Sequence, residues 1–251
     1  MKKPLVLIVA LFLFSGSIFQ QKRIMVAVAA NAQYAMKEIE KQYEKETGKD
    51  IELVIGSSGK LTAQIRERAP FDIFLSADMH YPEVLQKEGL TMYEPKIYGY
   101  GSLVLWTCKE IDLLNMNVLL LPEVKVIAMA NPKVAPYGEA AIEVMNYYKL
   151  YEKAEPKLVY GESISQVNQY VSSKAADLGF TAKSVVLSPE MQGKGKWMEL
   201  DKKSYKPIAQ GAVLLKASKE RSAADAEAFY NYLYSEKARK IFKKYGYQFA
   251  K

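Results

Sequence analysis

Hydrophobic positions along the chain form two kinds of pattern. Short, continuous apolar runs rich in Val, Ile, Leu and Phe are typical of strands buried on both faces. Longer stretches between them carry apolar residues at helical spacing. The strand-like runs cover residues 23–30, 50–55, 71–77, 124–130, 156–160 and 176–182. This alternation predicts an α/β architecture with mainly parallel sheets.

Amphipathic helices are predicted between and after these runs. Three helical faces carry Ala35, Met36, Ile39 and Tyr43; Ala140, Ala141, Val144, Met145 and Tyr148; and Val167, Tyr170 and Val171. The chain then ends in two further helices, over 222–235 and 236–246. Their inward-facing residues are expected to be Phe229, Leu233, Ala238, Ile241 and Phe242. Core packing explains these Met and Tyr stripes, so no cofactor site is inferred from them.

Two longer strand-like stretches, 97–109 and 205–217, are interrupted by glycine and break the alternation. They are compatible with two ordinary strands. They are equally compatible with two connections that cross between lobes, with a second domain inserted between them. The second interpretation gives lobe I residues 21–102 with 209–251, and lobe II residues 103–208.

The N-terminus has the form of a secretory signal. A basic start at Lys2 and Lys3 precedes an apolar run over residues 4–14 and small residues at 15–17. The apolar run is shorter than the roughly 20 residues that span a bilayer. We therefore expect residues 1–20 to be a signal peptide and the protein to be secreted. Because no cysteine directly follows the run, attachment to a lipid is not expected.

Composition excludes several classes of partner and site. The formal charge is +7, and loss of Lys2 and Lys3 with the signal lowers it to +5. Lysines and glutamates alternate along 37–49 as on a solvated helix face, so no nucleic-acid partner is predicted. Cys108 and His80 are the sole cysteine and histidine, which argues against a disulfide or a zinc site.

Enzyme sites are not supported by the motifs. The stretch 56–61, GSSGKL, resembles a phosphate-binding loop, but Leu61 stands where Ser or Thr is needed and Val54 where the first glycine is needed. An exported hydrolase using Ser57 or Ser58 would need a base, for which the sequence offers only His80. We expect no enzyme activity and keep the serine hydrolase as an alternative.

Four strand-to-helix corners offer donors for an anion instead. They lie at 29–36 with Asn31, at 56–61 with Ser57 and Ser58, at 131–141, and at 161–168 with Ser163 or Ser165 as cap. Unpaired N–H groups and the helix dipole favour negative charge at such corners. Helix capping explains any one of them. Four at the ends of successive strands favour a ligand site, because α/β sheets bind ligands outside those ends.

Taken together, these corners resemble the periplasmic molybdate-binding components of ABC transporters. The matching stretches are 26–39, 55–78, 131–145, 161–171, 177–184 and 229–247. GSSGKL followed by FDIFLSAD is the strongest of these matches. The resemblance implies a type II periplasmic-binding fold, in which two α/β lobes joined by two crossover segments close over a tetrahedral oxyanion in the cleft.

The resemblance also implies the ligand residues. They fall on Asn31, on Ser58 through hydroxyl and N–H, and on the main chains of Tyr137 and Ile164. Asn31 departs from the expected serine, although its amide can donate. Ala182 stands where many relatives have a tyrosine whose hydroxyl completes the site, so we expect Asn31, Tyr137 or Thr181 to replace that donor, or one bond to be missing. Gly56 and Gly59 are expected to let the backbone approach the oxyanion, and Lys60 to point to solvent.

Neutral donors suit a fully deprotonated oxyanion. Hydrogenphosphate is best recognised by adding an acceptor, which these positions lack. We therefore expect capture of molybdate, and also tungstate, for an ABC permease, by a periplasmic monomer without a cofactor or a directly bound metal cation. The alternatives are a receptor for sulfate or another tetrahedral oxyanion, the hydrolase, and a scaffold protein whose four corners are only caps.

Overall fold

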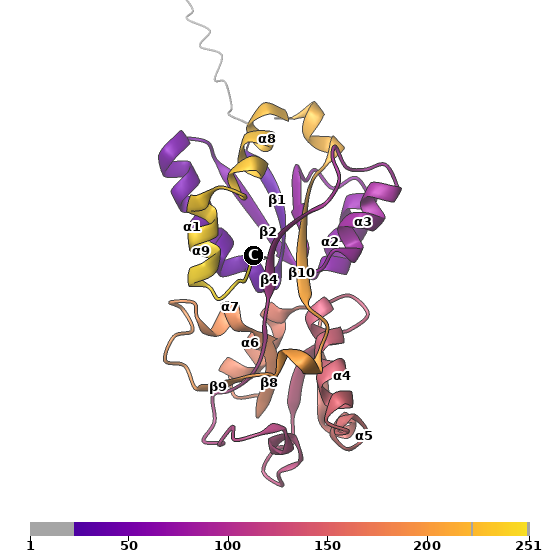
Figure 1. The fold of residues 1–251 in the computed structure, drawn as a ribbon, viewed down its shortest axis with the longest axis vertical. Coiled ribbons are helices and arrows are strands. Elements are labelled where there is room, and N and C mark those ends of the chain that lie inside the picture. Colours follow the sequence, from indigo (N-terminus) through magenta and orange to yellow (C-terminus); the bar gives the residue numbers. More distant parts are fainter. Residues whose placement is uncertain (1–22, 222, 250–251) are drawn as a thin grey trace, which may run out of the picture.

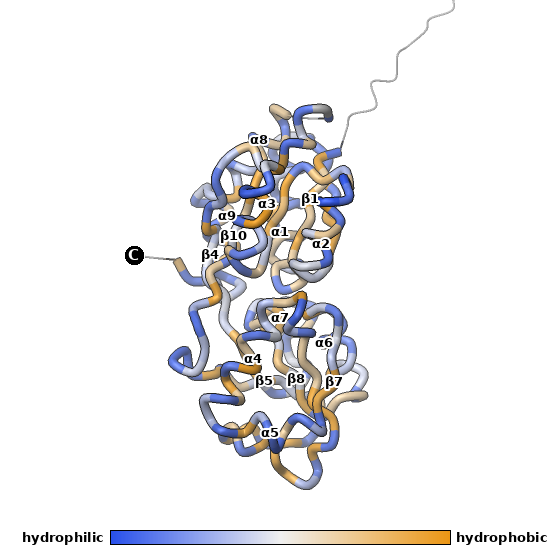
Figure 2. Tube along the Cα trace, turned by 90° about the vertical axis from the view of Figure 1, so that its right-hand side faces the viewer, coloured by the Kyte–Doolittle hydropathy of each residue, from blue (hydrophilic) through white to orange (hydrophobic). Residues whose placement is uncertain are grey.

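A computed structural model describes residues 23–221 and 223–249, so the predicted signal peptide lies outside the described residues. Two sheets stack end to end along the long axis of the molecule, each flanked by helices (Figure 1). We call the part around the sheet β2-β1-β3-β10-β4 lobe I and the part around β7-β6-β8-β5-β9 lobe II. Apolar segments follow the strands within both lobes (Figure 2).

Lobe I contains both ends of the described chain. Its strands are β1 (Ile24–Ala29), β2 (Ile51–Gly56), β3 (Ile73–Leu75), β4 (Lys96–Gly101) and β10 (Ile208–Leu214). Its helices are α1 (Gln33–Thr47), α2 (Ser58–Arg66), α3 (His80–Lys87), α8 (Ala223–Tyr232) and α9 (Glu236–Lys244), with the 3₁₀ turns η1 (Ala30–Ala32) and η5 (Lys216–Glu220).

Lobe II contains the middle of the chain. Its strands are β5 (Leu103–Thr107), β6 (Ile127–Ala130), β7 (Leu158–Gly161), β8 (Leu178–Ala182) and β9 (Lys196–Glu199). Its helices are α4 (Pro136–Tyr147), α5 (Tyr151–Ala154), α6 (Ile164–Ser172) and α7 (Lys183–Val186), with the 3₁₀ turns η2 (Met116–Leu120), η3 (Glu155–Lys157) and η4 (Lys202–Ser204).

The prediction of mainly parallel sheets is wrong, because both sheets are mixed. In lobe I, β1 pairs in parallel with β2 and β3, but β10 is antiparallel to β3 and β4. In lobe II, β6 pairs in parallel with β7 and β8, but β5 is antiparallel to β8 and β9. β5 and β10 each enter a sheet from the other lobe, at the carboxyl ends of its parallel strands, and therefore run against them.

The chain crosses between the sheets twice. β4 ends at Gly101 and β5 begins at Leu103, while β10 begins at Ile208 after η4. The two crossings touch, because the Leu103 N–H donates to the Tyr205 hydroxyl at 3.1 Å. The glycine-broken stretches are thus crossings between two sheets rather than strands of one. The lobe limits 21–102 with 209–251 and 103–208 stay a prediction.

The predicted core faces are buried. All six apolar runs form strands, and Phe229, Leu233, Ala238 and Phe242 are at most 1% exposed. The helical stripes of α1, α4 and α6 bury Met36, Ala141, Val167 and most of their neighbours as expected. Tyr148 is the exception, because it lies just past the end of α4 and is 38% exposed, so its prediction as a core residue is wrong. Within the described part of the chain, no helix has the length and apolar character needed to cross a membrane.

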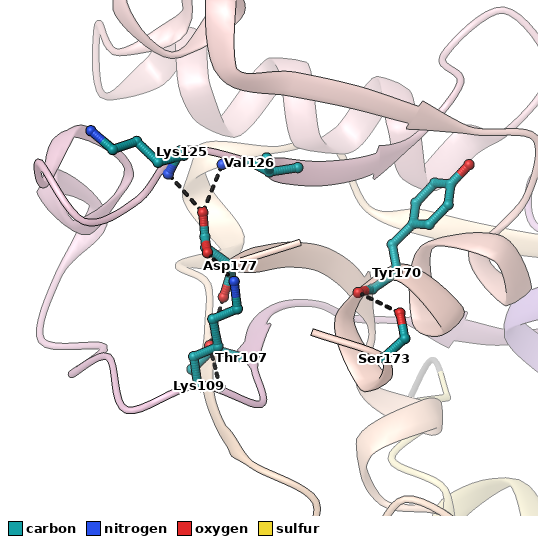
Figure 3. A network of polar contacts seen from close by, with 7 residues as sticks. All are labelled: Thr107, Lys109, Lys125, Val126, Tyr170, Ser173 and Asp177. Carbon is teal, nitrogen blue, oxygen red and sulfur yellow. Dashed lines mark hydrogen bonds and ion pairs between the residues drawn. The ribbon is translucent and has the colours of Figure 1, made fainter. Parts of the chain in front are cut away.

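A buried carboxylate fixes one end of the lobe II sheet (Figure 3). Asp177 precedes β8, and its Oδ2 accepts the N–H groups of Lys125 and Val126, both at 2.7 Å. The Lys109 ammonium pairs with its other oxygen, and the Thr107 hydroxyl donates to its carbonyl at 2.6 Å. Burial alone would raise the pKa of Asp177, but the Lys109 hydrogen bond and the backbone donors outweigh it and lower the pKa.

We expect Asp177→Asn to destabilise the protein in a pH-dependent way. The folded-state pKa of Asp177 lies below the unfolded value of about 3.9, so its contribution is complete above that value and is lost as the pH falls through the folded pKa. Urea unfolding of both proteins between about pH 6 and pH 3 measures this. The difference in the free energy of unfolding should shrink toward low pH, and a difference independent of pH would contradict the assignment.

Candidate functional site

A small pocket lies where the two lobes meet. Its cavity volume is only about 10 Å³, close to the space that one water molecule needs and far below the roughly 300–1,000 Å³ of sites that hold drug-sized ligands. Among the described residues, the twelve that line it are all uncharged: Ala29, Ala30, Asn31, Gly56, Ser57, Ser58, Ala77, Ala135, Pro136, Tyr137, Ser163 and Ile164. All four residues predicted from the sequence as ligands lie in this lining. The structure brings them together, and their roles as ligands stay a prediction.

Ser58 is the hydroxyl donor that the pocket offers most directly. It is the first residue of α2 and is 1% exposed. Its Oγ accepts the Ala77 N–H at 3.0 Å, which leaves the hydroxyl hydrogen to donate elsewhere. The neighbouring Ser57 is the N-cap, and its Oγ accepts the Lys60 N–H at 3.4 Å. The two serines of GSSGKL therefore have separate tasks, with Ser57 capping the helix and Ser58 available to a ligand.

Main-chain donors come from lobe II. Tyr137 follows Pro136 at the start of α4, and Ile164 is the first residue of α6. An α-helix leaves the N–H groups of its first turn without partners inside the helix. The N-cap of α6, Ser163, has extended backbone (φ −148°, ψ 170°) and makes no side-chain cap bond. Both helix starts can therefore direct N–H groups and the positive end of the helix dipole at an anion.

Asn31 is held by the protein rather than free. It lies in η1, is 1% exposed, and its Nδ2 donates to the Gln210 Oε1 at 2.8 Å and to the Tyr247 hydroxyl at 3.2 Å. A side-chain amide has two N–H hydrogens, and both are directed at these acceptors. In this arrangement Asn31 offers the pocket its main-chain N–H, in the first turn of η1, more readily than its side chain.

A buried polar network that the sequence did not indicate surrounds Asn31. The Tyr98 hydroxyl donates to the Gln210 Oε1 at 2.6 Å, and the Ser184 hydroxyl donates to the Asn31 carbonyl at 2.7 Å. Burial raises the pKa of Tyr98 and Tyr247, so both phenols stay neutral at physiological pH. The only signal in the sequence was the strand-like stretch 205–217, which contains Gln210.

Ala182, where the resemblance leads us to expect a tyrosine, has no access to the pocket. Ala182 ends β8, is fully buried, and lies outside the pocket lining. Thr181 is turned into lobe II, where its hydroxyl donates to the Asn168 Oδ1 at 2.6 Å. The Tyr137 phenol accepts the Gln210 Nε2–H at 3.1 Å. The Thr181 hydroxyl thus has a protein acceptor, whereas the Tyr137 phenol only accepts a hydrogen bond. The main-chain donors and Ser58 stay the groups that we expect to contact a ligand.

Gly59 and Lys60 take part in contact between the lobes. Only Gly56 lines the pocket, whereas the Gly59 N–H donates to the Val134 carbonyl of lobe II at 2.9 Å. A Cβ on Gly59 would lie 3.0 Å from Val134, so the expectation that Gly59 admits the oxyanion is wrong. Lys60 is half exposed, as expected, but its ammonium also pairs with the Glu162 carboxylate of lobe II at 2.8 Å.

The structure does not assemble the hydrolase alternative. His80 is the first residue of α3, and its ring packs edge-on against Tyr81. The hydroxyls of Ser57 and Ser58 have backbone N–H groups as partners instead. In the described ranges 23–221 and 223–249, no group of three His, Cys, Asp or Glu residues could hold a metal ion.

Comparison with known proteins gives consistent results. The family model of bacterial extracellular solute-binding proteins matches residues 24–248. The "Molybdate-binding protein ModA" of Rhodobacter capsulatus is 40% identical over 225 residues, which are 89% of this chain and 87% of that protein. The protein of the same name from Azotobacter vinelandii is 40% identical over 230 residues, which are 91% and 90% of the two chains.

A solved structure agrees with the sequence relatives. The periplasmic molybdate-binding protein of Azotobacter vinelandii superposes with a TM-score of 0.86 and 32% identity, covering 91% of this chain and all of that one. Its fold is therefore shared over nearly the whole length. Because the family model covers most of the chain and two relatives reach 40% identity over most of both sequences, this chain belongs to the family of bacterial extracellular solute-binding proteins.

Proposed function

We propose that this protein is a periplasmic receptor that captures molybdate, and also tungstate, between its two lobes and delivers it to an ABC permease. The observation that carries the proposal is the pocket between the lobes, whose uncharged lining combines the Ser58 hydroxyl with three helix starts. The names of the two relatives at 40% identity support the choice of oxyanion. The role is binding and not catalysis.

The chemistry of the lining supports a fully deprotonated anion. Molybdate, tungstate and sulfate present only acceptor oxygens near neutral pH, and the pocket offers the Ser58 O–H and main-chain N–H groups to them. Hydrogenphosphate brings a proton that needs an acceptor, and a carboxylate at the pocket would supply one. None of the described lining residues is Asp or Glu, so phosphate would leave a polar group unpaired.

Closure connects capture to delivery. The ligand contacts donors of both lobes only when the lobes meet, so binding shifts an open–closed equilibrium toward the closed form. The permease then distinguishes the closed receptor from the open one. We further propose that residues 1–20 direct secretion, that the mature protein carries no lipid, and that it acts as a monomer.

Titration calorimetry of the mature protein with molybdate, tungstate, sulfate and phosphate tests the proposal. Molybdate and tungstate should bind tightest and phosphate weakest. Sulfate binding as tight as molybdate would replace the proposal by the sulfate receptor. If no oxyanion raised the melting temperature, the scaffold alternative would be favoured, because ligand that binds the folded state must stabilise it.

The ion pair between Lys60 and Glu162 bridges the lobes at a second, larger pocket that adjoins the first through Gly56 and Ser163. Both side chains are about half exposed, at 53% and 52%. We expect Lys60→Gln or Glu162→Gln to weaken molybdate binding by at most about fivefold, mainly through faster release, because exposed pairs contribute little.

Stopped-flow release of molybdate at low and high salt measures this effect. The matched control is Lys237→Gln, which removes an ion pair to Glu46 of the same length, 2.8 Å, entirely within lobe I. That control should release molybdate at the wild-type rate. Equal release rates for Lys60→Gln and the control would show that the bridge does not retain the ligand.

A further inference from the structure

Gln210 is a fully buried amide on β10, the strand that returns the chain from lobe II to lobe I. Its Oε1 accepts two hydrogen bonds from lobe I, from the Asn31 Nδ2 at 2.8 Å and from the Tyr98 hydroxyl at 2.6 Å. Pairing of β10 with β4 shifts register between Gln210 and Gly211. Lobe I therefore fixes the orientation of this amide by itself.

The other end of the same amide reaches lobe II. The Gln210 Nε2 donates to the Tyr137 hydroxyl at 3.1 Å, and Tyr137 is 2% exposed at the start of α4. Burial raises the pKa of Tyr137, so the phenol is a neutral partner at physiological pH. One side chain thus contacts two residues of the pocket lining, Asn31 and Tyr137, without belonging to that lining.

Gly101 makes room for this contact. It ends β4, at the other crossing between the lobes. A Cβ at this position would lie 2.1 Å from the Tyr137 hydroxyl and 2.3 Å from the Gln210 Nε2. The position therefore needs glycine because side-chain groups approach its backbone closely. The crossing at β10 thus supplies Gln210, and the crossing at β4 supplies Gly101, which leaves space beside it. The hydrogen bond between Gln210 and Tyr137 joins the two lobes next to the pocket.

We propose that Gln210 is a positioning residue for oxyanion capture, which joins Tyr137 of lobe II to Asn31 of lobe I in the closed form and thereby stabilises that form. The inference rests on the proposed function. Opening the cleft breaks the bond to Tyr137 while the bonds to Asn31 and Tyr98, both within lobe I, persist. Gln210 is thus already oriented in the open form and gains one partner on closure, which lowers the cost of closing.

The decisive variants are Tyr137→Phe, which removes the phenol oxygen and keeps the main-chain N–H, and Gln210→Met, which removes the amide at similar length. Each should weaken molybdate binding by about 5- to 30-fold in calorimetry. The loss in the double variant should be smaller than the sum of the two single losses, because both changes remove the bond between Gln210 and Tyr137. Gly101→Ala should act in the same direction by driving a methyl group into the contact.

Measuring the distance between the lobes distinguishes a positioning role of Gln210 from a general loss of stability. Fluorescent labels on the two lobes report their separation with and without saturating molybdate. The variants should be more open than wild type in at least one of these states. The matched control is Tyr230→Phe, because that buried hydroxyl donates to the Ala212 carbonyl of the same strand at 3.3 Å but stays within lobe I. It should match wild type in affinity and separation.

The outcomes distinguish the two proposals. If wild type binds no oxyanion and the variants are nevertheless more open, the proposed function fails together with the role of Gln210 in capture, whereas the stabilisation of the closed form by Gln210 stands. If wild type binds molybdate and Tyr137→Phe matches it in affinity and separation, the role of Gln210 fails and the function stands. Strictly additive losses in the double variant, or no difference in lobe separation in either state, would also overturn the inference.

Discussion

Replacing Ser58 by alanine is expected to weaken molybdate binding by about 1–3 kcal/mol, the cost of leaving a charged ligand short of one buried hydrogen bond. The Ser58 hydroxyl is a side-chain donor of the pocket whose hydrogen is not directed at a described protein acceptor, since its oxygen accepts the Ala77 N–H. A dianion in a pocket lined by uncharged residues depends on each such donor. Titration calorimetry of the variant with molybdate measures the loss.

The matched control for this variant is Ser235→Ala. Ser235 caps α9, where its Oγ accepts the Ala238 N–H at 3.2 Å, far along the chain from the pocket. Loss of a cap should lower the free energy of unfolding by about 1 kcal/mol and leave the affinity for molybdate unchanged. If Ser58→Ala bound molybdate as tightly as wild type, the oxyanion would have to sit elsewhere.

The strand-to-helix corners of the site could be predicted from local sequence, because the donors at each corner come from a few consecutive residues. A strand that ends in Gly or Asn and is followed by a helical pattern places first-turn N–H groups at one edge of a sheet, whatever the rest of the fold does. The corners at 56–61 and 161–168 could therefore be named from the local sequence, whereas the choice of Ser58 and Ile164 within them came from the family resemblance, and both residues line one pocket. Local sequence could not show which of Ser57 and Ser58 caps the helix, because both are serines and either one can serve as an N-cap.

Strand direction and the contacts between lobes depend on positions far apart along the chain. A continuous apolar run is the same for a parallel strand and an antiparallel one, so the mixed sheets had no signature in the periodicity. The contact of Gln210 with Tyr137 joins residues separated by 73 positions. A single buried glutamine within a strand-like stretch gives no sign of which residues will surround it.

Glycine was ambiguous for a related reason. Gly56 and Gly59 were both expected to admit the ligand, since a missing side chain permits any close approach of the backbone. In the structure a Cβ on Gly59 would meet Tyr81 and Val134 of two different lobes. Gly59 therefore admits the second lobe rather than the oxyanion. A glycine in the sequence indicates that another group lies close to the backbone, but only the three-dimensional structure shows which group that is.

Ile164→Pro is expected to cause the other large loss, of about 1.5–3 kcal/mol in molybdate binding, by deleting one main-chain donor. Ile164 is the first residue of α6, the helix position that tolerates proline best. The preceding residue, Ser163, is already extended, as proline requires of its predecessor. The substitution thus removes the N–H with little cost to the helix, and calorimetry should find affinity reduced by roughly 10- to 150-fold.

Ile164→Val and Ile164→Ala separate the main-chain donor from the side chain. The side chain is 4% exposed, so its truncation to alanine should lower the melting temperature. Both controls retain the N–H and should bind molybdate nearly as wild type does, because the apolar side chain donates no hydrogen bond. If Ile164→Ala weakened binding as much as Ile164→Pro, packing of α6 and not its first N–H would govern the affinity. If all three bound like wild type, the second lobe would hold the oxyanion through the start of α4 alone.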